Sequence, residues 1–286
     1  MSKKNRLGQD RLFFIMLLPS LVGVFMFFVL PFALSLQNAL INNPVSRTFV
    51  GLKNFHDVFN NVAFQLALKN TIVFTMICIP LNMIVPLFLA ILLKRITQLR
   101  NIFGVIFLLP LVIPSGSMVF FWERIFGLNG LLNGIFFTHN PINWLDTPFA
   151  MAIVILIFMW KNAGFNIILY VAGLNFIPKE YYECAAVEGA GAIKQFFKIT
   201  LVYLTPTNFL VFMMSFINSF KGFKEIYLLS GNYPNSSIYL LQHYMYNQFS
   251  VANYQKLASS SYILTAGFVI IVIALFIFQK KATENF

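Results

Sequence analysis

The residues of this chain that could do chemistry are few and scattered. Among its 286 residues are three histidines, two cysteines and nine acidic side chains. No HExxH or CxxC pattern occurs, so no metal site is predicted. Cys78 lies in an apolar run and Cys184 in a loop, and they give no disulfide framework. No nucleophile–base pair is visible either, and we expect neither catalytic residues nor a bound metal.

One segment partly resembles a phosphate-binding loop. Gly189-Ala-Gly-Ala-Ile-Lys194 has two glycines before a lysine. It lacks the glycine directly before the lysine and the serine or threonine directly after it, and no strand precedes it. We therefore expect this chain to bind no nucleotide or other cofactor.

The composition is typical of a membrane protein. The chain is 59% hydrophobic and 10% charged, with 35 phenylalanines, whereas about a quarter of the residues in soluble domains are charged. Its net charge of +11 comes from basic residues at segment ends and not from one patch, which argues against nucleic-acid binding. The predicted class is an all-α, polytopic membrane protein.

Six apolar stretches have the length of about 20 residues that a membrane-spanning helix needs. Only the fourth contains a charge, Lys161. We expect a single transmembrane domain over residues 12–281, between terminal segments at 1–11 and 282–286. The stretches run from Leu12 past Pro31, between Lys69 and Lys94, from Asn101 to Trp122, over about 148–175, from Ile199 to Phe220 and from Leu257 to Gln279.

The basic residues predict the orientation of the chain. Basic residues concentrate on the cytoplasmic side of membrane proteins, and with both termini inside, twelve of the twenty basic residues are cytoplasmic. This arrangement also places the loop between the fourth and fifth spans in the cytoplasm. The twelve are Lys3, Lys4, Arg6, Arg11, Lys94, Arg95, Arg100, Lys179, Lys194, Lys198, Lys280 and Lys281.

An amphipathic helix is predicted on the outer surface, over about 52–68. Leu52, Phe55, Phe59, Val62 and Leu66 recur there at helical spacing, with polar residues between them. Simple cover for the helix bundle and a role in gating are both compatible with this pattern.

The loop over about 178–199 has the properties of a docking element. Residues 179–187 and 192–198 should form two short helices, with Gly189 and Gly191 allowing a sharp turn. Glu183 and Glu188 could make charge-assisted contacts with a basic groove, and Ala185, Ala186 and Ala190 would let a partner backbone approach closely. Ile193, Phe196, Phe197 and Ile199 are expected to anchor the second helix to the bundle.

The absence of acidic residues from the predicted spans favours an external motor. Carriers driven by ion gradients usually have carboxylates within the membrane, and here Lys161 would stand alone. We place Lys161 in the solute pathway, at a helix interface, or reaching outward to the membrane surface.

Polar residues on the fourth and fifth spans are candidates for the solute pathway. Polar side chains within a bilayer face other helices or a water-filled cavity, and amides beside aromatic rings would suit a sugar. The same groups could instead hold helices together. The polar candidates are Asn162, Asn166, Tyr170, Asn208, Ser215 and Asn218, and the aromatic candidates are Trp160 and Phe212.

At this point a family resemblance can be stated. Tyr182-Glu-Cys-Ala-Ala-Val-Glu-Gly-Ala190 and Phe196-Phe-Lys-Ile-Thr-Leu201 resemble the EAA loop of permease subunits from binding-protein-dependent ATP-binding-cassette (ABC) importers. Cys184 and Glu188 depart from the usual alanine and aspartate. Ala172-Gly-Leu-Asn-Phe-Ile-Pro178, among other segments, resembles the sugar-uptake branch, which includes maltose-type and glycerol-phosphate-type permeases.

The resemblance implies an assembly and an activity. It implies a heterodimer with a second permease subunit, an ATPase dimer that holds ATP and Mg, and an extracytoplasmic solute-binding protein. The loop, through Glu183, Cys184, Ala185, Ala186, Glu188, Gly189 and Ala190, would contact the ATPase. The implied substrate is a carbohydrate, an oligosaccharide or sugar derivative, imported across a bacterial or archaeal cytoplasmic membrane. The alternatives are a gradient-driven carrier or channel that works alone, and a membrane-embedded enzyme.

Overall fold

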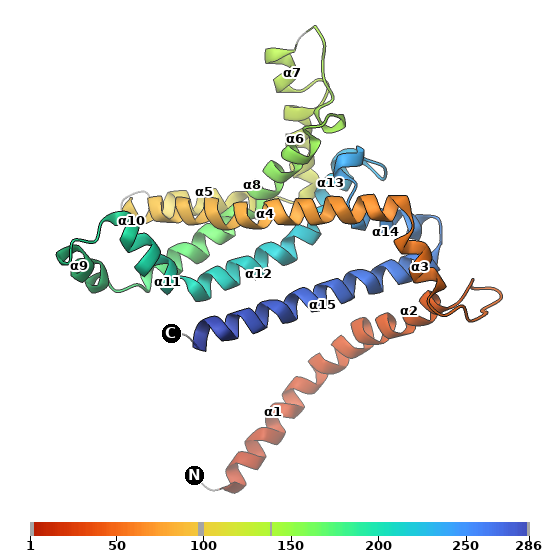
Figure 1. Cartoon of the computed structure of the whole chain (residues 1–286), viewed down its shortest axis with the longest axis horizontal. Coiled ribbons are helices and arrows are strands. Elements are labelled where there is room, and N and C mark those ends of the chain that lie inside the picture. The colour runs from red at the N-terminus through yellow and green to blue at the C-terminus, as the bar shows by residue number, and fades with distance from the viewer. Residues whose placement is uncertain (1–2, 97–99, 138, 285–286) are drawn as a thin grey trace. The chain divides into compact units, whose positions relative to one another are not determined.

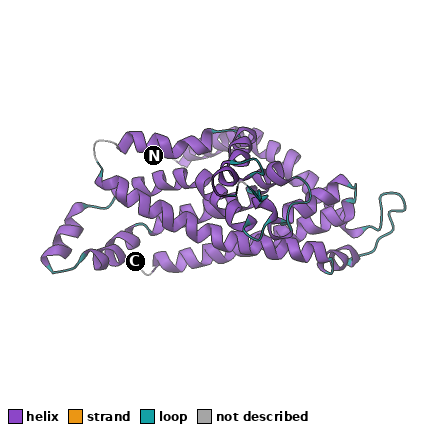
Figure 2. Cartoon of the chain, turned by 90° about the horizontal axis from the view of Figure 1, so that it is seen from above, coloured by secondary structure: helices purple, strands orange, loops and turns teal. Residues whose placement is uncertain are grey.

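A computed structural model describes residues 3–96, 100–137 and 139–284 of the protein. Helices and the loops between them account for the described residues, which include no β-strand (Figure 2). The predicted all-α class is therefore confirmed. The contacts divide the chain into two compact units, one of residues 1–62 with 245–286 and the other of residues 63–244.

The first unit joins the two ends of the chain. The helices α2 and α3 both pack on α15. The Asn54 amide links α3 to the end of α2, since it donates to the carbonyls of Ala39 at 2.9 Å and Ile41 at 2.8 Å. Its helices are α1 Lys3–Val24, the π-helix η1 Phe25–Val29, α2 Leu30–Leu40, α3 Lys53–Phe59 and α15 Tyr254–Glu284.

The second unit contains both predicted sites. Within it α5 and α12 pack on α8, and α13 packs on α6. In Figure 1, α9 and α10 lie together at one end of this unit, and α6 and α7 project from it. Its longer helices are α4 Val62–Arg95, α5 Arg100–Val112, α6 Ser115–Phe126, α7 Leu131–Phe136, α8 Ala150–Asn175, α9 Lys179–Val187, α12 Thr205–Lys221 and α13 Phe223–Ser230. Its short elements are η2 Trp144–Asp146, α10 Ala192–Gln195, η3 Phe196–Thr200, α11 Leu201–Tyr203 and η4 Ser236–Ile238, and α14 Leu241–Ser250 crosses the boundary with the first unit.

Four stretches of helix are long and apolar enough to cross a membrane, and six spans result if each of two bent helix pairs counts as one. The four stretches correspond to the first, second, fourth and sixth predicted spans. They are Phe14–Leu40, Val62–Arg95, Ala150–Asn175 and Tyr254–Ile277.

The third and fifth predicted spans are not continuous helices. The third bends by 99° between Val112 and Ser115, and the fifth bends by 70° between Tyr203 and Thr205. Pro114 explains the first break, because a proline disfavours helical backbone in the residue before it. At the second break Pro206 occupies the first turn of α12, where its missing N–H costs no hydrogen bond. Both spans lie where the sequence predicts them, but apolar length alone does not indicate that they bend.

The helix predicted over about 52–68 is interrupted. Residues 53–59 form α3, the chain turns at Asn60 and Asn61, and residues from Val62 onward belong to the 34-residue helix α4. Asn60 ends α3, with its N–H bonded to the His56 carbonyl at 3.0 Å.

Parts of the predicted terminal segments lie outside the described residues, namely 1–2 and 285–286. The same holds for several side chains used to predict the orientation. They are Lys3, Lys4, Arg6, Arg11, Arg100, Lys280 and Lys281.

Close backbone contact fixes α5 against α8. A Cβ placed on Gly164 would come within 1.7 Å of the Phe107 carbonyl oxygen, so only glycine allows this approach. Ile167, Tyr170 and Leu174 continue the same helix into an apolar core shared with α4 and α12. α8 is thus the central helix of the second unit, and it positions both candidate sites.

Candidate functional site

The loop after α8 has the predicted helix–turn–helix form. α9 has the predicted bounds, Lys179–Val187, and α10 continues into the π turn η3. Between them Gly189 has φ = 77°, a left-handed conformation that favours glycine. Ala190 closes the turn, with its N–H bonded to the Ala185 carbonyl at 2.8 Å.

α9 presents its functional candidates outward, since none of its residues is buried. Ala185 and Ala190 are half-buried, whereas the other candidates are exposed. Small side chains and two accessible carboxylates therefore occupy one projecting element. The exposed set is Glu183, Cys184, Ala186, Glu188 and Gly189.

Specific hydrogen bonds hold this element on the bundle. The hydroxyl groups of Tyr182 and Thr200 lie 2.9 Å apart, joining α9 to η3. At the end of α8, Lys94 Nζ from α4 donates to the Leu174 carbonyl at 2.7 Å. A basic group at a helix C-terminus satisfies a carbonyl that the helix leaves free. The Tyr182 contact therefore joins α9 to η3, and the Lys94 contact joins the end of α8 to α4.

Two of the four expected anchors of the second helix point away from the bundle. Ile193 is 77% exposed and Phe197 60%, so the expectation that they pack inward was wrong. Phe196 and Ile199 do pack against the apolar core. Ile193 of α10 and Phe197 of η3 are therefore exposed together with Val187 at the end of α9, which is 90% exposed. The exposed element is therefore apolar as well as acidic.

Three of the polar pathway candidates are buried in helix contacts. Asn166 on α8 donates to the Asn82 carbonyl on α4 at 3.1 Å and to Ser215 Oγ on α12 at 3.2 Å. Tyr170 is fully buried on the same helix. One turn further on, a Cβ on Gly173 would lie 2.5 Å from Thr207 Oγ1. Here the observed contacts are those of helix packing, one of the two interpretations of the sequence.

The remaining pathway candidates are half-buried and do not form one group. Asn162 donates to the Phe158 carbonyl of its own helix at 2.8 Å. The Trp160 ring stacks on Phe121 of α6 with centroids 5.7 Å apart, whereas the Phe212 ring stacks on Phe216 of its own helix. The two aromatic candidates thus belong to separate clusters. Asn208 and Asn218 are half-buried on α12.

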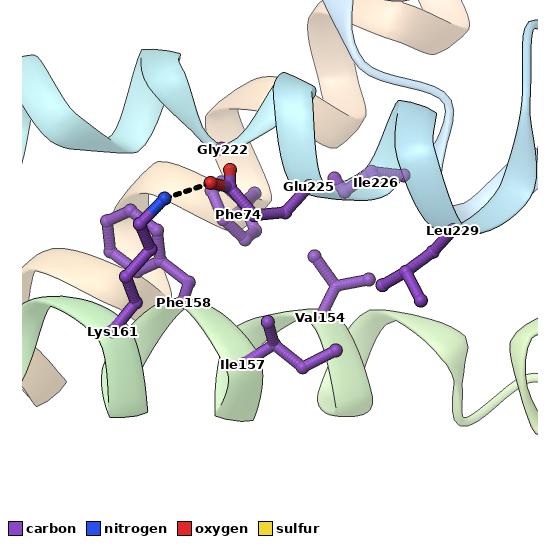
Figure 3. Close-up of a pocket in the computed structure, with 9 residues that line it drawn as sticks. All are labelled: Phe74, Val154, Ile157, Phe158, Lys161, Gly222, Glu225, Ile226 and Leu229. Atoms are coloured by element: carbon purple, nitrogen blue, oxygen red, sulfur yellow. Dashed lines mark hydrogen bonds and ion pairs between the residues drawn. The ribbon is translucent and has the colours of Figure 1, made fainter. Parts of the chain in front are cut away.

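Lys161 does not stand alone. Its ammonium group forms an ion pair with Glu225 of α13 (Figure 3). Ser115, at the start of α6, lies beside both charges: Lys161 Nζ donates to Ser115 Oγ at 3.1 Å, and that hydroxyl donates to Glu225 Oε1 at 3.1 Å. Only 21% of the lysine side chain and 12% of the glutamate side chain are exposed. Three helices therefore meet at one largely buried charged group.

The ion pair lies in a narrow crevice between α8 and α13. Aromatic and aliphatic side chains line the crevice with the two charges, and Figure 3 shows both reaching into it. The space inside is about 10 Å³, which is room for about one water molecule. The apolar lining includes Phe74, Val154, Ile157 and Phe158.

Sequence reasoning missed Glu225 and Ser115. Glu225 lies beyond the predicted end of the fifth span, yet the helix that begins at Thr205 continues through Gly222 into α13 and carries it to Lys161. The unpaired charge of Lys161 was itself the available signal, because a charged residue within a membrane normally has a partner. No group of three or more metal-ligating side chains occurs among the described residues.

The long apolar helices and the projecting helix pair are typical of a multi-pass membrane protein. The chain belongs to the family described as binding-protein-dependent transport system inner membrane component, whose sequence pattern matches residues 70–282. It is an ABC transporter permease of the cytoplasmic membrane, and members of this family are non-catalytic subunits.

Similar proteins cover most of the chain. A trehalose/maltose transport system permease protein of Thermococcus litoralis is 28% identical, over 98% of both chains. An arabinooligosaccharides transport system permease protein of Bacillus subtilis is 34% identical, over 80% of this chain and 76% of its own. In the crystal structure of a bacterial ABC transporter involved in the import of the acidic polysaccharide alginate, one chain matches with a TM-score of 0.82 at 23% identity. It covers 97% of this chain and 98% of its own, and this likeness shows a shared fold.

Proposed function

We propose that this protein is one of two permease subunits of an ATP-driven importer, and that its solute is a carbohydrate, an oligosaccharide or sugar derivative. Each bent helix pair forms one span, which gives six spans with both termini in the cytoplasm. Family membership supports the importer. The oligosaccharide and disaccharide transport named for the two relatives supports the substrate class.

The single observation that carries the ATPase contact is the exposed helix α9. It presents the carboxylates of Glu183 and Glu188 beside small side chains, a surface that fits a cleft lined by basic residues. The apolar side chains of Val187 and Ile193 are exposed next to it and would be covered by a docked subunit. The ATPase would hold ATP and Mg, and the solute would arrive from an extracytoplasmic binding protein.

We propose that movement of α9 is transmitted into the membrane through contacts at the end of the bundle. The hydrogen bonds of Tyr182 and Lys94 join α9 to η3 and link the end of α8 to α4. When the two ATPase subunits close on ATP, the docked helix would move with them as a rigid body and tilt α8. We predict that the pathway residues of α8 and α12 change their contacts in this step.

The test is co-purification of the complex after Glu183→Lys. Reversing this exposed charge should abolish or strongly weaken recovery of the ATPase with the permease, and ATP-dependent uptake in liposomes should be lost with it. Glu123→Lys, the same change at an exposed site on α6, is the control and should retain the ATPase. Full recovery of the ATPase with Glu183→Lys would refute the docking proposal.

A gradient-driven carrier is the second candidate, and the buried Lys161–Glu225 ion pair is compatible with it, whereas family membership favours the ATP-driven importer. Buried charges within a membrane are typical of ion-coupled transport, and the argument from missing acidic residues no longer holds because Glu225 is present. Purified chain reconstituted without ATPase distinguishes the two candidates. Uptake that follows an imposed proton or sodium gradient would establish the carrier.

A further inference from the structure

In a membrane, the ion pair of Lys161 and Glu225 would lie at a depth where a charged group is energetically unfavourable. Lys161 is the twelfth residue of the 26-residue helix α8, which places it about 17 Å along the helix from its start. In a spanning helix this position is near the middle of the hydrocarbon layer, where a charged side chain costs several kcal/mol. An apolar pair of similar size would often be at least as stable as a buried ion pair. Stability alone therefore does not account for these two residues.

We infer that Glu225 is a specificity-determining residue that cancels the charge of Lys161 in the solute pathway and so favours uncharged carbohydrates over acidic ones. This inference rests on the proposed function. It deepens that function by naming the class of substrate, a neutral sugar.

The geometry of the crevice supports this role. Its interior of about 10 Å³ is closed to a sugar, so a solute that passes here must part α8 from α13 and come directly beside the charges. The rings of Phe74 and Phe158 line the same crevice with centroids 5.3 Å apart, and both are buried. Parting the helices would expose these aromatic faces beside the polar groups, an arrangement that suits a sugar ring. The crevice thus combines a closed constriction with groups that a sugar could use.

The electrostatics of the pair explain the selectivity. Lys161 and Glu225 contribute one positive and one negative charge in contact, so their net charge is zero and their field falls off steeply with distance. A uronate or phosphate group would have to compete with Glu225 for Lys161, or approach the Glu225 carboxylate. A neutral hydroxyl can hydrogen-bond to either residue without separating the charges.

The experiment measures uptake of two solutes by the complete reconstituted complex. Neutral trisaccharides and trisaccharides with one uronate group are supplied with the same binding protein, and the ratio of acidic to neutral uptake is compared with that of the natural chain. Glu225→Gln leaves Lys161 uncompensated, and we expect the ratio to rise at least about tenfold, because one free charge acts strongly in a partly desolvated site. Lys161→Gln should lower the ratio, and the double variant should restore it.

A second variant keeps the test decisive if the single changes impair folding. Ser115→Asp adds a carboxylate beside an intact ion pair and should also lower the ratio. Glu123→Gln, the same chemical change at an exposed carboxylate, should leave the ratio unchanged. Equal losses of acidic and neutral uptake in all the variants at residues 115, 161 and 225 would overturn the inference and leave a structural ion pair. A natural chain that prefers the acidic solute would overturn it as well.

Failure of the proposed function gives a different result. In that case the natural complex shows no ATP-dependent uptake of any carbohydrate, so no ratio exists. If the natural complex does take up sugar, every value of the ratio bears on Glu225 alone.

Discussion

His243 is a buried titratable residue outside the helices that could span a membrane. Its Nδ1 accepts a hydrogen bond from the Leu240 N–H at 3.1 Å, and its ring packs edge-on to Phe223 with centroids 4.6 Å apart. The ring of Tyr239 also packs against the imidazole ring. Removal from water lowers the pKa of His243 to about 4. The folded chain therefore keeps this imidazole neutral.

This pKa predicts a pH dependence of stability. In the unfolded chain His243 takes up a proton below its ordinary pKa of about 6.5, whereas the folded chain resists protonation until about 4. The contribution of His243 to the free energy of unfolding should be constant above pH 6.5 and fall by up to about 3 kcal/mol between pH 6.5 and 4. Below pH 4 this contribution should not fall further. The measurement is the unfolding temperature in detergent at each pH.

The matched variant is His243→Asn, which keeps an acceptor for Leu240 and does not titrate. It should lose this component of the pH dependence. An unchanged profile in the variant would contradict the assignment.

At the scale of helices, the contact of α5 with α8 depends on Gly164. The Cβ of an alanine there would meet backbone, the Phe107 carbonyl oxygen, which cannot rotate away as a side chain can. We predict that Gly164→Ala destabilises the protein by at least about 2 kcal/mol, as overpacking does. The unfolding temperature should fall clearly. Gly116→Ala is the control, since a Cβ there meets no atom within 4 Å, and it should have little effect.

The conformation of the turn after α9 is the basis of a second prediction. Gly189 has φ = 77°, and a side chain in that conformation costs about 1–2 kcal/mol. Because α9 is not buried, Gly189→Val should displace the helix without unfolding the bundle, and ATPase affinity should fall about 5–30-fold. Titration of the ATPase against the permease in detergent measures this. The control is Gly191→Ala, at a glycine with negative φ and open space around it, and this variant should bind the ATPase normally. Equal ATPase affinity of the two variants would contradict the proposed role of the Gly189 turn.

The same elements show how far the sequence predicts the structure. α9 and α8 were placed within two residues, because proline, glycine and apolar length mark their ends in the sequence. A proline lies at each of the two bends, but the sequence does not predict their angles of 99° and 70°, since hydrophobic length is independent of helix direction. The sequence predicts that Asn166 and Ser215 are polar residues facing other helices or the pathway. It does not identify Asn82 and Ser215 as the hydrogen-bond partners of Asn166, because residues on one helix face can meet several neighbours. Glu225 was missed for a related reason: its partner is 64 residues away in sequence.

At the scale of the whole molecule, the central question is which side of the membrane α9 faces. Four lysines lie at that end of the second unit, near or within its two short helices. Basic residues gather on the cytoplasmic side, so their concentration here agrees with the proposed orientation. They are Lys94, Lys179, Lys194 and Lys198.

The natural cysteines allow a direct test of this orientation. Cys184 is exposed on α9, whereas Cys78 is buried in α4 and out of reach of a bulky charged reagent. We predict that a membrane-impermeant maleimide labels the protein in inside-out vesicles stripped of the ATPase and leaves it unlabelled in intact cells or spheroplasts. Cys184→Ala should remove the label, which assigns it to α9. Because ATPase docking at α9 requires access from the cytoplasm, labelling of Cys184 in intact spheroplasts would refute the orientation and, with it, the proposed coupling of ATP hydrolysis to transport through this helix.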